Sequence, residues 1–161
     1  MAIIDELARR IGRLEKWARE HVAFEPTNST CQVYIKGAQA IATGAPQDVL
    51  FDVEVYDPDD LHSLVANTDR ITIIVPGVYV ITAYASWEQH DTGTRRIRIT
   101  VNAATVSGQE GDTGGATITH DQSASHQRLL AAGAVVRLAA YQTSGGDLNL
   151  DACSLEVTRI S

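Results

Sequence analysis

The chain has 161 residues, of which 44% are apolar and 20% charged, and its formal net charge at pH 7 is −7. This length suits one domain with an appendage and is too short for two full domains. The composition, with a mean hydropathy of −0.08, excludes a disordered chain, and no stretch approaches the roughly 20 apolar residues that a membrane helix needs.

The charge is unevenly distributed along the chain. Residues 1–22 carry five basic and four acidic side chains, which leaves eight basic and sixteen acidic ones in residues 23–161, a net charge of −8. Because a body of that sign repels phosphate backbones, we expect no nucleic-acid partner. The first ten residues carry acids where a secretory signal needs a basic segment, and no apolar run of signal length follows, so we expect cytoplasmic synthesis without a signal peptide.

Residues 1–22 are predicted to form a helix that oligomerises. Apolar side chains recur there in alternating steps of three and four residues, at Ile4, Leu7, Ile11 and Leu14. With isoleucine at a and leucine at d, Arg10 takes a g position and Glu15 the following e position, the pairing that links parallel helices. The preferred interpretation is a coiled-coil seam, and an amphipathic helix lying on its own domain is the alternative. Residues 23–30 contain a proline and polar turn formers and are predicted to be a linker.

From residue 31 the apolar periodicity changes from helical to alternating. Residues 71–75, 96–102 and 154–158 place apolar side chains at every second position, which is typical of strands with one buried face. Clusters of turn-forming residues separate such runs, at 43–46, 57–60, 76–77, 91–93, 107–115 and 144–147. About eight to ten short strands indicate an all-β antiparallel sandwich or jelly roll for residues 31–161.

Two of the predicted strands are apolar on both faces. Residues 78–87 carry Tyr79 and Ile81 on one face and further apolar side chains on the other, and residues 135–141, which end at Tyr141, alternate in the same way. Because only one face of a sandwich strand goes to the core, something else must cover the second face. A second subunit is the preferred cover, with Tyr79, Ile81 and Tyr141 as candidate contacts, and a local segment of the same chain is the alternative.

The order of the strand motifs resembles a known family of domains. The motifs are, in order, Val49-Leu50-Phe51-Asp52, Tyr56-Asp57, Ile71-Thr72-Ile73, Pro76-Gly77-Val78-Tyr79, Arg96-Ile97-Arg98-Ile99, Tyr141-Gln142 and Ser154-Leu155-Glu156-Val157. Together they resemble the globular heads of complement component 1, subcomponent q, in their bacterial and phage versions. The resemblance implies a ten-stranded jelly roll of the tumour-necrosis-factor type that assembles as a homotrimer, with the N-terminal helix as a three-stranded stalk.

Two further expectations combine residue chemistry with this resemblance. Asp57, Asp59 and Asp60 bring three carboxylates close together, as calcium requires, and some members of the family bind calcium; a plain Asp-Pro turn is the alternative. Cys31 is expected on the first strand and Cys153 just before the last, and these strands are neighbours in the family's jelly roll. A disulfide and two buried free thiols both remain open, and the cytoplasmic expectation favours the thiols.

The sequence argues against an enzyme. Asp91-Thr92-Gly93 and Asp112-Thr113-Gly114 spell the aspartic-protease tripeptide but have polar residues before them, where a protease has an apolar strand. In an extended strand, His120 and His126 face opposite to Asp121, which separates imidazole from carboxylate and prevents a simple triad. A polar strand or loop is the preferred interpretation of residues 119–126, and no cofactor is expected.

These observations favour a trimeric structural or binding module of a bacteriophage particle, such as a head decoration, head fibre or tail-associated protein. We expect it in the virion after synthesis in the host cytoplasm, in contact with a capsid or tail protein. A host-surface glycan is a further candidate partner, through the 88–94 and 107–117 loops with Trp87, His90 and Asp91 as the ligand surface. The alternative is a bacterial glycan- or protein-binding lectin-like module exported by another route.

Overall fold

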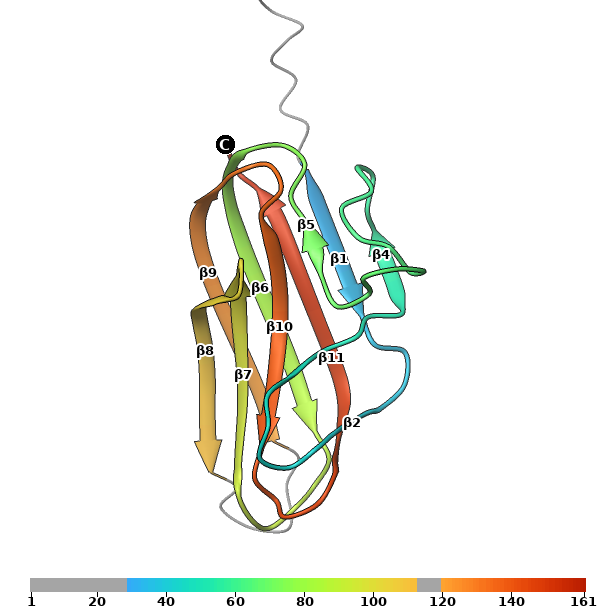
Figure 1. Ribbon diagram of the computed structural model, residues 1–161, viewed down its shortest axis with the longest axis vertical. Helices are drawn as coiled ribbons and strands as arrows, with labels where there is room; N and C mark the ends of the chain where they lie inside the picture. Colours follow the sequence, from blue (N-terminus) through green and yellow to red (C-terminus); the bar gives the residue numbers. More distant parts are fainter. Residues whose placement is uncertain (1–28, 113–119) are drawn as a thin grey trace, which may run out of the picture.

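The computed structural model describes residues 29–112 and 120–161, so the predicted coiled-coil helix with Ile4, Leu7, Ile11 and Leu14 lies outside the described residues. The described chain forms two antiparallel sheets packed face to face (Figure 1). Its strands are β1 (Thr30–Tyr34), β2 (Gln39–Ile41), β3 (Gln47–Asp48), β4 (Val53–Tyr56), β5 (Ile71–Thr72), β6 (Gly77–Trp87), β7 (Thr94–Val101), β8 (Ala104–Asp112), β9 (His120–Leu130), β10 (Val135–Gln142) and β11 (Leu148–Arg159).

The strand order confirms the predicted all-β antiparallel sandwich. One sheet runs β4-β1-β11-β6-β9, with β2 also pairing with β11, and the other runs β3-β10-β7-β8, with β5 also pairing with β10. The first strand therefore lies beside the last one, β11, along its whole length. Within the described residues no helix is long and apolar enough to span a bilayer.

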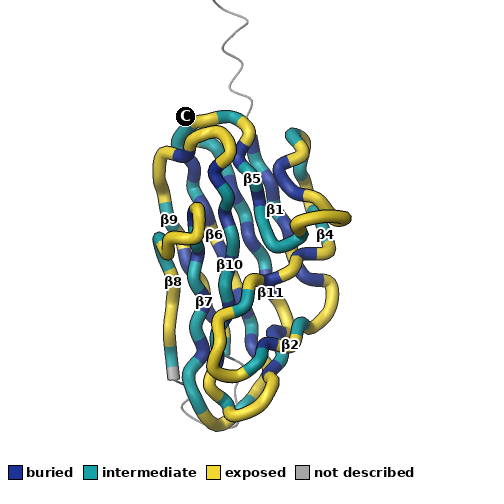
Figure 2. The backbone as a smooth tube through the Cα atoms, viewed as in Figure 1, coloured by how far each residue is buried: buried dark blue, intermediate teal, exposed yellow. Residues whose placement is uncertain are grey.

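The core lies between the sheets and is built by alternation. Along β7 and β10, every second side chain is buried and the others are partly exposed, and Figure 2 shows the same alternation along the central strands. Strand β11 changes phase once: Leu150 and Cys153 both point inward, and the register shifts between Leu150 and Ala152. This bulge adds one residue, which keeps the apolar side chains on the core face over a strand of twelve residues.

The structure corrects the prediction for one segment, residues 107–112, and confirms it for another, residues 120–126. The predicted turn cluster at 107–115 is wrong up to residue 112, because Ala104–Asp112 forms strand β8 and pairs with β7. Its Gly108 permits close strand contact, since a Cβ there would lie 2.5 Å from the carbonyl oxygen of Ile97. Strand β9 pairs along its whole length with β6, so the polar-strand interpretation of residues 120–126 is confirmed.

The two cysteines are free and buried. Cys31 faces Val157 across the β1–β11 pair, whereas the carbonyl of Cys153 accepts a hydrogen bond from Ile35 N at 3.1 Å. Four positions of strand β11 therefore separate them, about 13 Å at the usual rise per residue and too far for a disulfide. Burial raises the pKa of both thiols. Of the two open alternatives, buried free thiols are confirmed, and Cys153 lies within the last strand rather than before it.

Candidate functional site

The two sheets present chemically different outer surfaces. The sheet of β4, β1, β11, β6 and β9 turns Tyr34, Tyr56 and Tyr84 outward, and we call this surface the tyrosine face. The sheet of β3, β10, β7 and β8 turns Arg96, Arg98, Arg137 and Tyr141 outward, and we call this surface the arginine face. Because the sheets pack back to back on one core, the two faces point in opposite directions.

Two neighbouring rows across the middle of the tyrosine face carry a single charge. One row across the sheet reads Tyr34, Ser154, Tyr84 and Ser123, and the next reads Gln32, Glu156, Thr82 and Ser125. Glu156 is the only charged residue in these two rows, and its Oε1 accepts a hydrogen bond of 3.0 Å from the hydroxyl of Tyr56. Tyr34, Tyr56 and Tyr84 are 37%, 38% and 40% exposed. Exposed tyrosines with few charged residues around them are typical of the centre of protein interfaces.

The structure places the predicted contact residues differently from the expectation. Tyr79 and Ile81 have no exposed area and form part of the core, so the outward residues of β6 are Val78, Val80, Thr82 and Tyr84. The prediction that both faces of this strand are apolar is correct for Val78, Val80 and Tyr84. The sequence pattern alone does not show which of the two faces points into the core. Tyr141 does point outward, on the other sheet, where Arg96 covers its ring.

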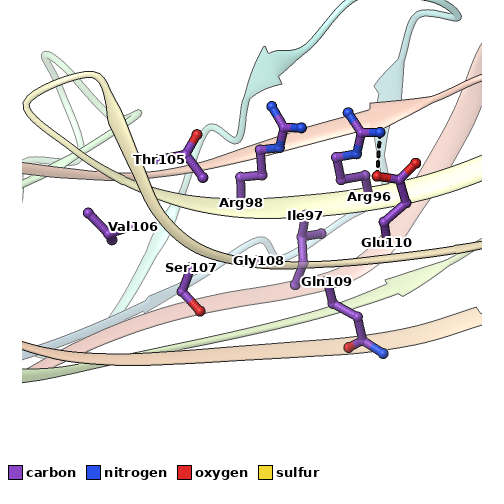
Figure 3. A pocket seen from close by; sticks show the side chains of 9 residues that line it. All are labelled: Arg96, Ile97, Arg98, Thr105, Val106, Ser107, Gly108, Gln109 and Glu110. Carbon is purple, nitrogen blue, oxygen red and sulfur yellow. Dashed lines mark ion pairs between the residues drawn. The ribbon is translucent and has the colours of Figure 1, made fainter.

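The arginine face is centred on β7, along which buried and outward-facing side chains alternate without interruption. Arg96 and Arg98 point outward between the buried residues Arg95, Ile97 and Ile99. Across the strand pairs, Arg96 faces Glu110 on one side and Tyr141 on the other, and it makes an ion pair with the Glu110 carboxylate (Figure 3). The hydrogen bond that Arg96 donates to this carboxylate raises the pKa of Arg96. The charge of Arg96 is therefore locally compensated.

Arg98 differs from Arg96 because its cross-strand neighbours are Gly108 and Ala139. Neither neighbour carries a polar side chain, and Arg98 makes no ion pair within the described residues. A shallow groove of about 310 Å³ lies over β7 and β8, and the heads of Arg96, Arg98 and Thr105 rise on the same side of it (Figure 3). The groove thus offers a guanidinium next to a hydroxyl.

The third arginine of this face is fully paired. Arg137 Nε lies 2.6 Å from Asp69 Oδ2 and 3.5 Å from Asp48 Oδ2, and Asp69 also pairs with Arg70 at 2.9 Å. Desolvation alone would raise the pKa of Asp69, but the hydrogen bonds from Arg137 and Arg70 outweigh it and hold this pKa below its ordinary value. Arg137 therefore ties the loop before β5 to β10 and is not available to a ligand.

The predicted ligand surface at Trp87, His90 and Asp91 is only partly exposed. Trp87 is fully buried, and its Nε1 donates a 3.0 Å hydrogen bond to Gln122 Oε1, so its assignment to a ligand surface was wrong. Trp87 is buried because it follows the alternation of β6 at a position whose side chain points into the core. His90 and Asp91 lie in the loop after β6 with side chains that are 37% and 62% exposed, and their Nδ1 and Oδ1 atoms are 3.8 Å apart.

The three aspartates of the predicted calcium site do not converge. The Asp57 carboxylate accepts hydrogen bonds from the backbone N–H groups of Leu61 and His62, at 2.9 and 2.7 Å, which closes the turn. Within residues 29–112 and 120–161, no group of three or more His, Cys, Asp or Glu side chains is arranged to hold a metal ion. Asp57, Asp59 and Asp60 thus make the turn that was the alternative interpretation.

The groove residues Arg96 and Arg98 were not singled out from the sequence, where they served only as part of a strand motif. The signal that could have found them is the Arg-x-Arg spacing in residues 96–98, because a period of two places both guanidiniums on one face of a strand. The neighbours Gly108 and Ala139, which leave Arg98 unpaired, follow from the strand register and could not be read from the sequence.

No protein-family model matches the chain, and no curated protein matches it. Solved structures do. The globular domain of zebrafish complement 1qA protein aligns with a TM-score of 0.61 and 17% identity, over 83% of this chain and 98% of that one. Murine APRIL aligns with a TM-score of 0.65 and 11% identity over 83% and 100%, and Eiger TNF from S. frugiperda with 0.57 and 15% over 83% and 93%.

The chain has the complement 1q and tumour-necrosis-factor fold. At these identities the likeness is one of fold, and it confirms the predicted jelly roll of tumour-necrosis-factor type.

Proposed function

We propose that the protein is a non-enzymatic homotrimeric binding module that assembles through the tyrosine face and binds an acidic glycan on the arginine face. The observation that carries the binding proposal is Arg98, which lines the groove over β7 and β8. Its cross-strand neighbours are Gly108 and Ala139, and it has no carboxylate partner among the described residues. The tumour-necrosis-factor fold supports the assembly proposal.

The tyrosine face is the natural contact between subunits. Tyrosine is enriched and charged residues are depleted in the centre of protein interfaces, and the rows through Ser154 and Glu156 have this composition. The Glu156 carboxylate, the only one in these two rows, already accepts a hydrogen bond from the hydroxyl of Tyr56. Assembly through this face leaves the arginine face, on the opposite side of the sandwich, pointing away from the contact.

The ligand class follows from the chemistry of the groove. A guanidinium recognises a carboxylate with two parallel hydrogen bonds, which makes arginine selective for planar acidic groups. The groove is shallow, and Thr105 adds a hydroxyl beside Arg98 (Figure 3). A shallow surface with a hydroxyl and one uncompensated cation suits a saccharide that carries a carboxylate, such as a uronic acid.

A direct test compares acidic and neutral oligosaccharides by calorimetric titration of the full chain. We expect binding of an oligouronate, no binding of the neutral oligosaccharide of the same length, and at least a tenfold weaker affinity after Arg98→Gln. Arg128→Gln, which removes an exposed arginine from β9 in the other sheet, is the matched control and should bind as the unchanged protein does. Equal affinity of the Arg98 and Arg128 variants would contradict the proposal.

We further propose that the module is carried by a bacteriophage particle, with the N-terminal segment on a capsid or tail protein. The support is the sequence resemblance to bacterial and phage heads of this type. Purified particles should then contain the protein in a fixed ratio to the capsid protein. Its presence on uninfected cells and its absence from particles would instead favour the lectin-like bacterial module.

A further inference from the structure

Arg95 is a buried arginine in the core of the sandwich. Along β7 its neighbours Thr94 and Arg96 face outward, so alternation sends Arg95 inward, where its side chain has no exposed area. Arginine is among the residues that are almost never fully buried unless they are paired. A partner for the guanidinium of Arg95 is therefore expected inside the sandwich.

The guanidinium of Arg95 is only half satisfied. Its Nη1 donates to the carbonyl oxygens of Thr92 and Thr94 at 3.1 and 3.2 Å, whereas its Nε and Nη2 are buried without a hydrogen-bond partner. Desolvation lowers the pKa of Arg95, but a guanidinium keeps its proton in proteins, so a positive charge remains inside. An uncompensated buried charge is strongly unfavourable.

Within the described residues Arg95 makes no ion pair, and its cross-strand partner is Gly111, which has no side chain. Gln122 donates from its Nε2 to the backbone carbonyl of Arg95 at 3.0 Å, and its Oε1 already accepts the indole N–H of Trp87.

A second unpartnered nitrogen lies beside the same glycine. His120 Nε2 is buried without a hydrogen-bond partner, and a Cβ on Gly111 would lie 3.0 Å from the Cε1 and Nε2 atoms of this imidazole. His120 opposes Trp87 in the β6–β9 pair and faces the core, as Arg95 does from β7. Two groups that can donate hydrogen bonds thus flank Gly111 from different strands.

We propose that Arg95 and His120 bind a small inorganic anion of chloride size between the sheets, beside Gly111. The anion would accept hydrogen bonds from Nε and Nη2 of Arg95 and from Nε2–H of His120, and it would neutralise the buried charge. Because Arg95 has no exposed area, the site excludes large organic anions. The missing side chain of Gly111 lets the His120 imidazole approach β8, because a Cβ there would lie 3.0 Å from its Cε1 and Nε2 atoms. This site is separate from the groove of Arg98 and does not depend on the proposed function.

Bromide is the probe for this site, because it replaces chloride and can be located by anomalous scattering. In crystals of the full chain soaked in sodium bromide we expect an anomalous peak at hydrogen-bond distance from Arg95 Nη2 and His120 Nε2. A peak that contacts only one of the two, on an exposed part of the surface, would mean an adventitious ion only and would overturn the proposal. Absence of any peak beside Gly111 would overturn it as well.

Thermal unfolding in solution gives an independent readout. At equal ionic strength and pH, chloride should raise the melting temperature above its value in gluconate by about 3–6 °C when chloride is tenfold above its dissociation constant. Arg95→Met and Gly111→Ala should abolish this difference between the salts, whatever they do to the melting temperature itself. Arg98→Gln, an outward arginine of the same strand, should keep it. The same chloride dependence in Arg95→Met would overturn the proposal.

Discussion

The guanidinium carbon of Arg96 lies 5.1 Å from the centre of the Tyr141 ring, and the same guanidinium pairs with Glu110. One arginine of β7 thus connects β10 to β8 across the arginine face. The contact explains why Tyr141 is half-buried although it points away from the core. Because Arg96 covers its ring, Tyr141 does not need a second subunit to cover it.

Tyr141→Ala should destabilise the fold by about 0.5–1 kcal/mol beyond the loss of buried ring area, because an exposed cation–π contact has this magnitude. Tyr141→Phe keeps the ring and should be near neutral. A double-mutant cycle with Arg96→Met, followed by urea unfolding, isolates the coupling. A coupling energy of zero would show that the ring and the guanidinium do not interact.

Trp87→Phe should cost about 1–3 kcal/mol of unfolding free energy. The substitution removes the donor to Gln122 Oε1 and leaves a buried acceptor unsatisfied, while Gln122 Nε2 still donates to the carbonyl of Arg95 at 3.0 Å. Gln127→Leu, at an exposed position of β9, is the control and should change stability much less. Equal effects of the two substitutions would refute the role of this buried hydrogen bond.

Cys31 and Cys153 should react with a thiol reagent only after unfolding. Both are buried, and burial raises the pKa of both thiols, so almost no thiolate is available in the native protein. A reagent that yields a coloured product should therefore count two thiols in denaturant and none in buffer. A melting temperature that falls on addition of a reductant would reveal a disulfide and contradict the strand register.

The pair of Asp69 and Arg137 makes stability depend on acidic pH. The pKa of Asp69 is held below its ordinary value of 3.8, so its contribution to stability is complete above this value and is lost as the pH falls toward the lower, folded-state pKa. Asp69→Asn should flatten the loss of stability below about pH 4, as measured by urea unfolding across a pH series. Asp147→Asn, at an aspartate of the β10–β11 loop, is the control. Parallel pH profiles of the Asp69 variant and the unchanged protein would contradict this assignment.

The fold could be predicted from the sequence because alternation in residues 96–102 and 154–158 survives intact in β7 and β11. The sequence could not show which face of each strand points into the core. Residues 78–87 are apolar on both sides, so the pattern did not show that Tyr79, Ile81 and Trp87 face the core. Strand β8 was missed because Ser107, Gly108 and Gly111 are turn formers in isolation. The glycines are needed because β7 approaches Gly108 closely and the His120 ring of β9 approaches Gly111.

The candidate sites depend on register more than on residue type. Arg96 and Arg98 are two positions apart and chemically alike, yet one faces Glu110 and the other Gly108. Arg95, directly before Arg96, is buried opposite Gly111. Three neighbouring basic side chains in one strand therefore have three different surroundings, and strand pairing over long sequence distances decides which of them can bind a ligand.

The central claim is assembly through the tyrosine face, and light scattering of the full chain tests it most directly. We expect three times the mass of a single chain, which is 17.4 kDa for the full chain, and likewise three times its own smaller mass for a chain that begins at Ala23. Tyr84→Asp, which places a charge in the middle of this face, should give single chains when it is made in the shorter chain, whereas Arg98→Gln should remain trimeric. A single-chain mass for the unchanged protein, or a trimer that tolerates Tyr84→Asp in the shorter chain, would contradict the account.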